Sequence, residues 1–155
     1  MIKVLFICHG NICRSPLAEF LFKKHVADKG DADKFLIESA ATSSEELGNP
    51  VYPPTKKILD GLNIDCSSKR ARKIVLQDYE KFDYIIGMDD YNIRNMNNFF
   101  GGDNKGKIYK LLDFSANRKG QDVADPWYTG DFETTKRDIE LGIESFYNHI
   151  FNEKS

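Results

Sequence analysis

The 155-residue sequence lacks a long hydrophobic run and has no large excess of charge of either sign. Its N-terminal apolar stretch is too short for a membrane span or a signal peptide, so neither is expected. The formal net charge is −2, with acidic and basic residues interspersed, which gives no support for a nucleic-acid or membrane-surface partner. Repeats and low-complexity segments are also missing, which favours a single domain over residues 1–155.

Cysteine and histidine are scarce, with three residues of each. A small number of cysteines without a recognisable export signal is typical of a protein with reduced thiols, so we expect a cytoplasmic location. His9, His25 and His149 are scattered along the chain, which is not the spacing of metal ligands. The sequence therefore predicts no metal site, and no cofactor is expected.

The residues that indicate a function are concentrated in the first fifteen positions, MIKVLFICHGNICRS. The apolar run from Ile2 to Ile7 suits a central strand that is covered on both faces. Ser15 is a good helix N-cap, and Pro16 is favoured at the first helical position. This stretch therefore predicts a strand that ends near Cys8, a short loop and a helix.

The residues of the loop are those that a phosphate-binding turn needs. Gly10 and Asn11 adopt positive φ at low cost, so we expect both to turn the chain with its amides pointing inward. Inward amides and a helix N-terminus attract a tetrahedral dianion, and Arg14 can grip two of its oxygens. A free thiol is only about 3% ionised at neutral pH. The same positive field would favour the thiolate of Cys8 and make it a nucleophile.

Apolar periodicity and turn residues predict the remaining elements. We expect strands over residues 2–7, 35–39, 84–88 and 108–112, helices over 16–29, 54–62, 90–99 and 132–150, a helical turn at 78–82, and loops over 40–54 and 114–128. Strands alternating with helices indicate an α/β three-layer sandwich. A ligand would then bind at the carboxyl ends of the strands, beside the first loop.

Displacing an alkoxide or phenolate from phosphate also needs a proton donor near the leaving oxygen. Asp125 is the best local candidate. It lies in a long loop stiffened by Pro126, and Trp127 and Tyr128 follow it as aromatic residues that could exclude water. An Asp-Pro pair alone commonly marks a turn, so this assignment depends on the rest of the site.

The segment CHGNICRSP, Cys8 to Pro16, resembles the C-x5-R-S signature of the low-molecular-weight protein tyrosine phosphatases. Three further segments fall in the order and spacing of that family: Ser39 to Pro50, Ala71 to Asp89 and Ala124 to Glu133. The resemblance covers nearly the whole chain. It implies a four-stranded parallel sheet in the order 2-1-3-4 and a phosphotyrosine-containing protein or small aryl phosphate as substrate, with inorganic phosphate as product.

The resemblance also implies roles for individual residues. Cys8 would carry a phosphocysteine intermediate, Arg14 would bind phosphate, and Asp125 would act first as general acid and then as general base. Ser39 matches a serine that supports the loop. The phosphate-binding loop would further comprise His9, Gly10, Asn11, Ile12, Cys13 and Ser15. Cys13 matches a second loop cysteine that can form a reversible disulfide with the nucleophile.

Several positions depart from the family pattern, and these bear on substrate preference. His9 stands where many members have an apolar residue, and Trp127 replaces a common tyrosine. Glu45 falls in a segment where members often have an aromatic wall, so it would bring negative charge to the pocket mouth. Trp127 and Tyr128 would form the opposite wall. Lys69 or Arg70 stands near the place of a supporting histidine.

Other functions remain open for the same loop. An arsenate reductase would share the loop and its anion, but it needs a further pair of cysteines, and Cys66 stands alone. An inactive phosphate-binding module is disfavoured because Cys8, Arg14 and Asp125 are all retained. A redox-sensing role for Cys8 and Cys13 is compatible with phosphatase activity.

Overall fold

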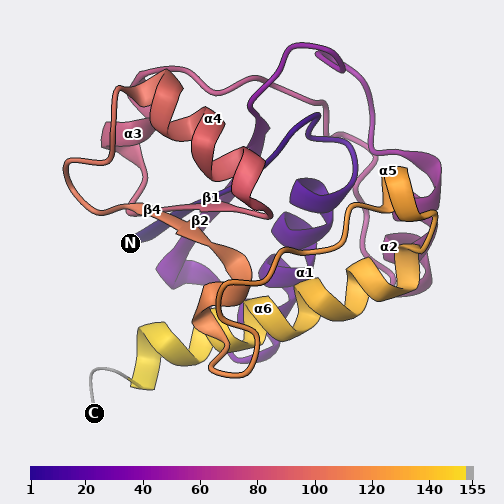
Figure 1. The fold of residues 1–155 in the computed structure, drawn as a ribbon. Coiled ribbons are helices and arrows are strands. Elements are labelled where there is room, and N and C mark those ends of the chain that lie inside the picture. The colour runs from indigo at the N-terminus through magenta and orange to yellow at the C-terminus, as the bar shows by residue number, and fades with distance from the viewer. Residues whose placement is uncertain (153–155) are drawn as a thin grey trace.

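The computed structural model describes residues 1–152 and contains a four-stranded parallel sheet (Figure 1). The strands are β1 (Ile2–Cys8), β2 (Phe35–Ala41), β3 (Tyr84–Gly87) and β4 (Ile108–Lys110). Their order across the sheet is β2-β1-β3-β4. The expected α/β fold class and the 2-1-3-4 strand order are therefore confirmed.

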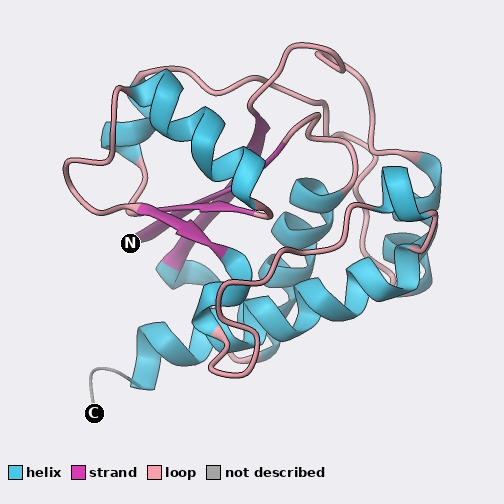
Figure 2. Cartoon of the chain, viewed as in Figure 1, coloured by secondary structure: helices cyan, strands magenta, loops and turns pink. Residues whose placement is uncertain are grey.

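Helices cover both faces of this sheet (Figure 2). On one face lie α1 (Arg14–Asp28) and the long α6 (Phe132–Asn152), with α2 (Pro53–Gly61) beside α1. On the other face lie α4 (Asp90–Phe100) and the short α3 (Gln77–Lys81). The remaining helical elements are η1 (Ala32–Lys34), η2 (Leu111–Phe114) and α5 (Pro126–Thr129).

The position of β1 at the centre of the sheet explains why its sequence is apolar from Val4 onward. Its alternate side chains enter two different cores, one on each face of the sheet. Val4, Phe6 and Cys8 join the core under α1 and α6, whereas Leu5 and Ile7 join the core under α4. Cys8 thus lies at the carboxyl end of the central strand, on the side where α1 begins.

The start of α1 differs from the prediction. The helix begins at Arg14, and its N-cap residue, Cys13, makes no side-chain capping bond. Ser15 was predicted to cap the helix, but it lies inside the first turn, and its hydroxyl contacts Cys8 and Asn11 instead. A hydroxyl that bonds within the loop is not available for a helix terminus, so the capping prediction was wrong.

Other boundaries differ from expectation by one or two residues. The fourth strand ends at Lys110, and the residues Leu111–Phe114 continue as the short helix η2. The expected loop over residues 114–128 contains the start of α5, which begins at Pro126 directly after Asp125. Within residues 1–152, no helix has both the length and the apolar character needed to cross a bilayer.

Candidate active site

The loop from Cys8 to Arg14 joins the central strand to α1 and turns around the Cys8 sulfur. Asn11 has the positive φ that the sequence predicted, at 61°. Gly10 was also expected at positive φ, but it is not among the residues with that conformation. A Cβ at Gly10 would lie 3.2 Å from Cγ of Glu46, so space beside Glu46 is what limits this position.

The Cys8 sulfur is buried and surrounded by hydrogen-bond donors. The residue is 3% exposed. Its Sγ lies 3.0 Å from Oγ of Ser15, and the backbone amide of Asn11 donates to it over 3.3 Å. Donors that point at a sulfur stabilise its anionic form, because a thiolate accepts hydrogen bonds more strongly than a neutral thiol. This environment fits a nucleophilic cysteine.

The side chain of Asn11 joins the loop to neighbouring segments through hydrogen bonds. Its Nδ2 donates to Oγ of Ser15 over 2.8 Å and to Oγ of Ser39 over 2.9 Å, and its Oδ1 accepts from the backbone amide of Arg72 over 3.1 Å. All three partners come from different elements or segments. Ser39, on β2, therefore lies behind the loop, where the resemblance implied a supporting role.

A buried carboxylate continues this network and was missed at the sequence level. Glu19 is 4% exposed and accepts from Oγ of Ser39 over 2.5 Å. Lys69 Nζ lies 3.2 Å from the same Glu19 oxygen and donates to the backbone carbonyl of Ser39. A signal existed in the sequence, since Glu19 is one helical turn after Ser15 and shares its buried face.

Ile12 and Cys13 anchor the other side of the loop. Both side chains are buried and form a small apolar cluster with Ala71, against which Tyr52 packs. The backbone amide of Tyr52 also donates to the carbonyl of Ile12 over 2.9 Å. The side chains of this half of the loop therefore contribute to packing.

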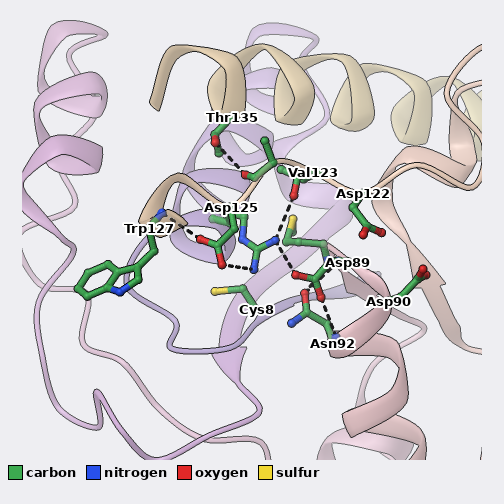
Figure 3. A network of polar contacts seen from close by, with 12 residues as sticks. Cys8, Asp89, Asp90, Asn92, Asp122, Val123, Asp125, Trp127 and Thr135 are labelled. Atoms are coloured by element: carbon green, nitrogen blue, oxygen red, sulfur yellow. Dashed lines mark hydrogen bonds and ion pairs between the residues drawn. The ribbon is translucent and has the colours of Figure 1, made fainter. Parts of the chain in front are cut away.

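Arg14 is buried in a polar network, and its partners Asp89, Val123 and Asp125 are labelled in Figure 3. Its Nη1 donates to Oδ2 of Asp89 over 2.8 Å and to the carbonyl of Val123 over 3.1 Å, and its Nη2 lies 3.4 Å from Oδ2 of Asp125. Burial alone would lower the pKa of Arg14. The negative charges of Cys8, Asp89 and Asp125 outweigh that effect and raise the pKa, so the guanidinium is always charged.

Asp89 is a second residue that sequence reasoning missed. It follows β3 and caps α4, accepting from the amide of Asn92 over 2.8 Å while the Asn92 side chain bonds back. Its other oxygen holds Arg14. An aspartate directly after a buried parallel strand and before a helix is a recognisable signal for a site residue, and this signal could have identified it.

Asp125 meets the other amino group of Arg14 from the loop before α5. Its Oδ1 accepts from the amide of Trp127 over 3.0 Å, which makes Asp125 the N-cap of α5. The side chain is 28% exposed. Asp125 and Cys8 line the same cavity, and both are labelled in Figure 3. Asp125 is 117 residues from Cys8 in the sequence, yet the fold brings the two together.

A cavity of about 850 Å³ opens over these groups. Cys8, Arg14 and Asp125 line it together with four rim residues of the expected set: His9, Glu45, Trp127 and Tyr128. Nε2 of His9 lies 3.0 Å from Oε2 of Glu45 across the rim. Trp127 and Tyr128 are 58% and 86% exposed, and the Trp127 ring packs beside Tyr52. Glu46, Tyr91 and Asp122 also line the cavity and were not singled out from the sequence.

Groups that could ligate a metal are not gathered here. Among residues 1–152, no three histidine, cysteine or acidic side chains form a cluster suited to a metal ion. One oxygen of Asp89 and one of Asp125 instead contact the Arg14 guanidinium. The arrangement therefore offers a buried sulfur, a guanidinium and a nearby carboxylate, which together can bind and transfer an oxyanion.

The two loop cysteines differ in reactivity. Burial, together with the negative charges of Cys8 and Asp125, raises the pKa of the Cys13 thiol to about 12. At neutral pH only about one Cys13 in 10⁵ is then a thiolate, the reactive form. We therefore expect iodoacetamide at neutral pH to alkylate Cys8 and to spare Cys13, and Cys13 should become reactive only in strongly alkaline solution.

This selectivity is measured by peptide fragmentation, because both cysteines lie in one tryptic peptide, Val4 to Arg14. Inorganic phosphate should slow the labelling by covering Cys8. A Cys8→Ser variant is the matched control and should remain almost unlabelled within this peptide. Labelling of Cys13 first, or at the same rate as Cys8, would contradict the prediction.

Comparison with known proteins identifies what the whole chain is similar to. The family model described as "Low molecular weight phosphotyrosine protein phosphatase" matches residues 3–155. The protein-tyrosine-phosphatase YfkJ of Bacillus subtilis is 41% identical over 154 residues, with 99% of each chain covered. PtpA of Staphylococcus aureus is 39% identical over 133 residues, covering 86% of this chain and 83% of PtpA.

Solved structures agree with the sequence comparison. The crystal structure of YfkJ superposes with a TM-score of 0.95 over 100% of this chain and 98% of that one. The low molecular weight protein tyrosine phosphatase SP-PTP from Streptococcus pyogenes has a TM-score of 0.86 at 40% identity, covering 97% and 94% of the two chains. The fold and the sequence thus point to the same group of proteins.

Proposed function

This chain belongs to the low molecular weight phosphotyrosine protein phosphatase family, and from that premise we propose how its residues hydrolyse phosphate monoesters. The protein is a hydrolase of the protein tyrosine phosphatase class. The proposal is that Cys8 forms a phosphocysteine intermediate while Arg14 binds the phosphate and Asp125 transfers the proton. The observation that carries it is the meeting of these three side chains in one cavity.

The first step transfers the phosphoryl group to sulfur. The Cys8 thiolate attacks phosphorus in line with the leaving oxygen, so that the S–P bond forms as the P–O bond breaks. The guanidinium of Arg14 and the inward amides of the loop hold the equatorial oxygens. Asp125, in its protonated form, gives its proton to the leaving phenolate.

The second step releases phosphate. Asp125, now a carboxylate, takes a proton from a water molecule as that water attacks the phosphorus of the phosphocysteine. The S–P bond breaks, inorganic phosphate leaves, and the Cys8 thiolate is restored. The Ser15 hydroxyl, 3.0 Å from the sulfur, stabilises the thiolate as it departs. In this mechanism Arg14 and the loop amides neutralise the phosphate charge, and no cofactor takes part.

We infer that the rim selects the substrate. The exposed rings of Trp127 and Tyr128 provide a face for the phenyl ring of phosphotyrosine or of a small aryl phosphate. His9 and Glu45, which contact each other, line the same cavity. The substrates proposed are therefore phosphotyrosine-containing proteins or small aryl phosphates, and the reduced Cys8 that the mechanism needs fits action by the single domain in the cytoplasm.

The competing arsenate reductase activity is less well supported by the arrangement of thiols. Cys66 is buried in the core, 2% exposed, and is not part of the cavity lining. Burial also raises its pKa, so it is poorly suited to be the thiol that attacks at the loop and supplies electrons for arsenate reduction. A direct test incubates the protein with p-nitrophenyl phosphate in the presence of a chelator. Ester hydrolysis supports the phosphatase, whereas arsenate-dependent oxidation of thioredoxin without ester hydrolysis would favour the reductase.

The role of Asp125 gives a prediction that depends on the leaving group. Phenolate is a poor leaving group and needs the proton, whereas p-nitrophenolate departs readily without it. In Asp125→Ala we expect kcat/KM to fall by about 10²-fold for phenyl phosphate but by less than about tenfold for p-nitrophenyl phosphate. The inhibition constant of inorganic phosphate should change little. An equal loss for both esters would refute the role of Asp125 as acid.

A further inference from the structure

Val123 and Ala124 are the two residues before Asp125. Each backbone N–H and each backbone C=O of these two residues forms a hydrogen bond. The amide of Val123 donates to the carbonyl of Met88 over 2.9 Å, and the carbonyl of Val123 accepts from Arg14 over 3.1 Å. The amide of Ala124 donates to Oδ2 of Asp138 over 3.1 Å, and the carbonyl of Ala124 accepts from Oγ1 of Thr135 over 2.8 Å. The segment that carries Asp125 is thus fixed on both of its sides.

The bonds to Ala124 come from α6, which has no residue in the cavity lining. Thr135 and Asp138 are one helical turn apart and share a face of α6. Both are buried, at 1% and 6% exposed. Figure 3 shows Thr135 reaching from α6 toward the chain between Val123 and Asp125. A threonine and an aspartate buried at this spacing hold one residue, Ala124, by both its N–H and its C=O.

The second oxygen of Asp138 binds a residue earlier in the loop that leads to Asp125. Oδ1 of Asp138 accepts from Nη2 of Arg118 over 3.1 Å. One carboxylate therefore joins the loop before Asp125 at two points, Arg118 and Ala124. A bond from the Thr135 hydroxyl to the carbonyl four residues earlier, that of Asp131, does not explain its position. That distance is 3.4 Å, whereas the hydroxyl lies 2.8 Å from the carbonyl of Ala124.

We propose that Thr135 and Asp138 are positioning residues that set the place of Asp125 over the reacting phosphate. The proposal rests on the function proposed above, in which Asp125 is the proton donor. Among residues 1–152, the hydrogen-bond partners of the Asp125 side chain are the amide of Trp127, at 3.0 Å, and Arg14, at 3.4 Å. Its reach therefore depends on the backbone position, and a shift of about 1 Å in a catalytic group can cost up to 10²-fold in rate.

The test uses two variants of matched shape. Thr135→Val keeps the volume and branching of the side chain but removes the donor to Ala124, and Thr135→Ser keeps the donor. The control is Thr134→Val, because Thr134 is the preceding residue and its hydroxyl bonds to exposed neighbours at the start of α6, donating to Asp131 and accepting from Arg137, rather than to the loop before Asp125. Each protein is assayed for kcat/KM with phenyl phosphate and p-nitrophenyl phosphate and for inhibition by inorganic phosphate.

We expect Thr135→Val to lower kcat/KM by about tenfold for phenyl phosphate and by less than about twofold for p-nitrophenyl phosphate. Phosphate inhibition should be unchanged, Thr135→Ser should restore the activity, and Thr134→Val should behave like the wild type. An equal change for both esters, no change for either, or a weakened phosphate inhibition would overturn the proposal, since each outcome indicates a purely structural role or none.

Asp138→Ala keeps the proposal testable if Thr135→Val does not fold. It removes the other half of the grip on Ala124, and the same selective loss with phenyl phosphate is expected. Asp125→Ala, assayed in parallel, separates the two levels of the argument. If Asp125→Ala itself shows no dependence on the leaving group, the proposed acid is wrong. If Asp125→Ala is selective and the α6 variants are not, only the positioning role is wrong.

Discussion

Replacing Cys8 with serine is expected to lower kcat by at least about 10⁴-fold. A serine hydroxyl stays neutral at this position and is a far weaker nucleophile than a thiolate, so the first step of the mechanism fails. Binding of inorganic phosphate should be retained or tightened, because the variant loses the negative charge that repels the dianion. The measurement is p-nitrophenyl phosphate turnover together with direct titration of phosphate.

The matched control is Cys13→Ser, which changes the other cysteine of the same loop. Cys13 is buried in the apolar cluster with Ile12 and Ala71, and its raised pKa keeps it protonated. Its replacement should preserve most of the activity. If Cys8→Ser kept substantial turnover, or if Cys13→Ser were the inactive variant, the assignment of the nucleophile would be wrong.

Replacing Arg14 with alanine is the second large effect, and it should damage binding and turnover together. Arg14 is 3% exposed, and among residues 1–152 it is the only arginine or lysine in the cavity lining. We expect kcat to fall by about 10³-fold and phosphate inhibition to weaken by about tenfold or more. Lysine should not rescue the activity, because it lacks the planar fork that binds two oxygens at once.

Loss of Arg14 also leaves the carboxylate of Asp89 without its partner, which should destabilise the fold by about 3 kcal/mol. Thermal unfolding therefore has to accompany the assay, at a temperature where the variant is folded. Arg72→Ala is the matched control. Arg72 pairs with Asp78 and Glu38 outside the cavity, so its loss should affect stability more than catalysis. Wild-type phosphate binding in folded Arg14→Ala would contradict the account.

The elements that could be predicted from the sequence are those with a local signal. The nearly continuous apolar run of β1 predicted a central parallel strand, and the structure buries residues from Val4 to Cys8 on both faces of the sheet. Asn11 was predicted at positive φ because few residue types adopt that conformation cheaply. The long α6 was evident from its helical spacing of apolar residues. These features need no knowledge of distant contacts.

What could not be predicted depends on partners far away in the chain. Ser15 has the composition of an N-cap, but the tertiary environment uses its hydroxyl for the Cys8 sulfur. Glu19 and Lys69 lie close together because both bind Ser39 on β2: Glu19 accepts from its hydroxyl, and Lys69 donates to its carbonyl. Asp89 is a capping residue by local pattern, and its bond to Arg14 follows from the adjacency of β1 and β3. Local propensity carries no information on these pairings.

A crystal structure of the wild-type protein with orthovanadate tests the central claim most directly. Vanadate adopts the five-coordinate geometry of phosphoryl transfer. The account predicts that it binds inside the Cys8–Arg14 loop with the Cys8 sulfur bonded to vanadium in an axial position. The loop amides and the Arg14 guanidinium should hold the equatorial oxygens, and Asp125 should lie at the opposite axial oxygen. A vanadate bound elsewhere, or a loop that leaves the Cys8 sulfur turned away from the ion, would contradict the account.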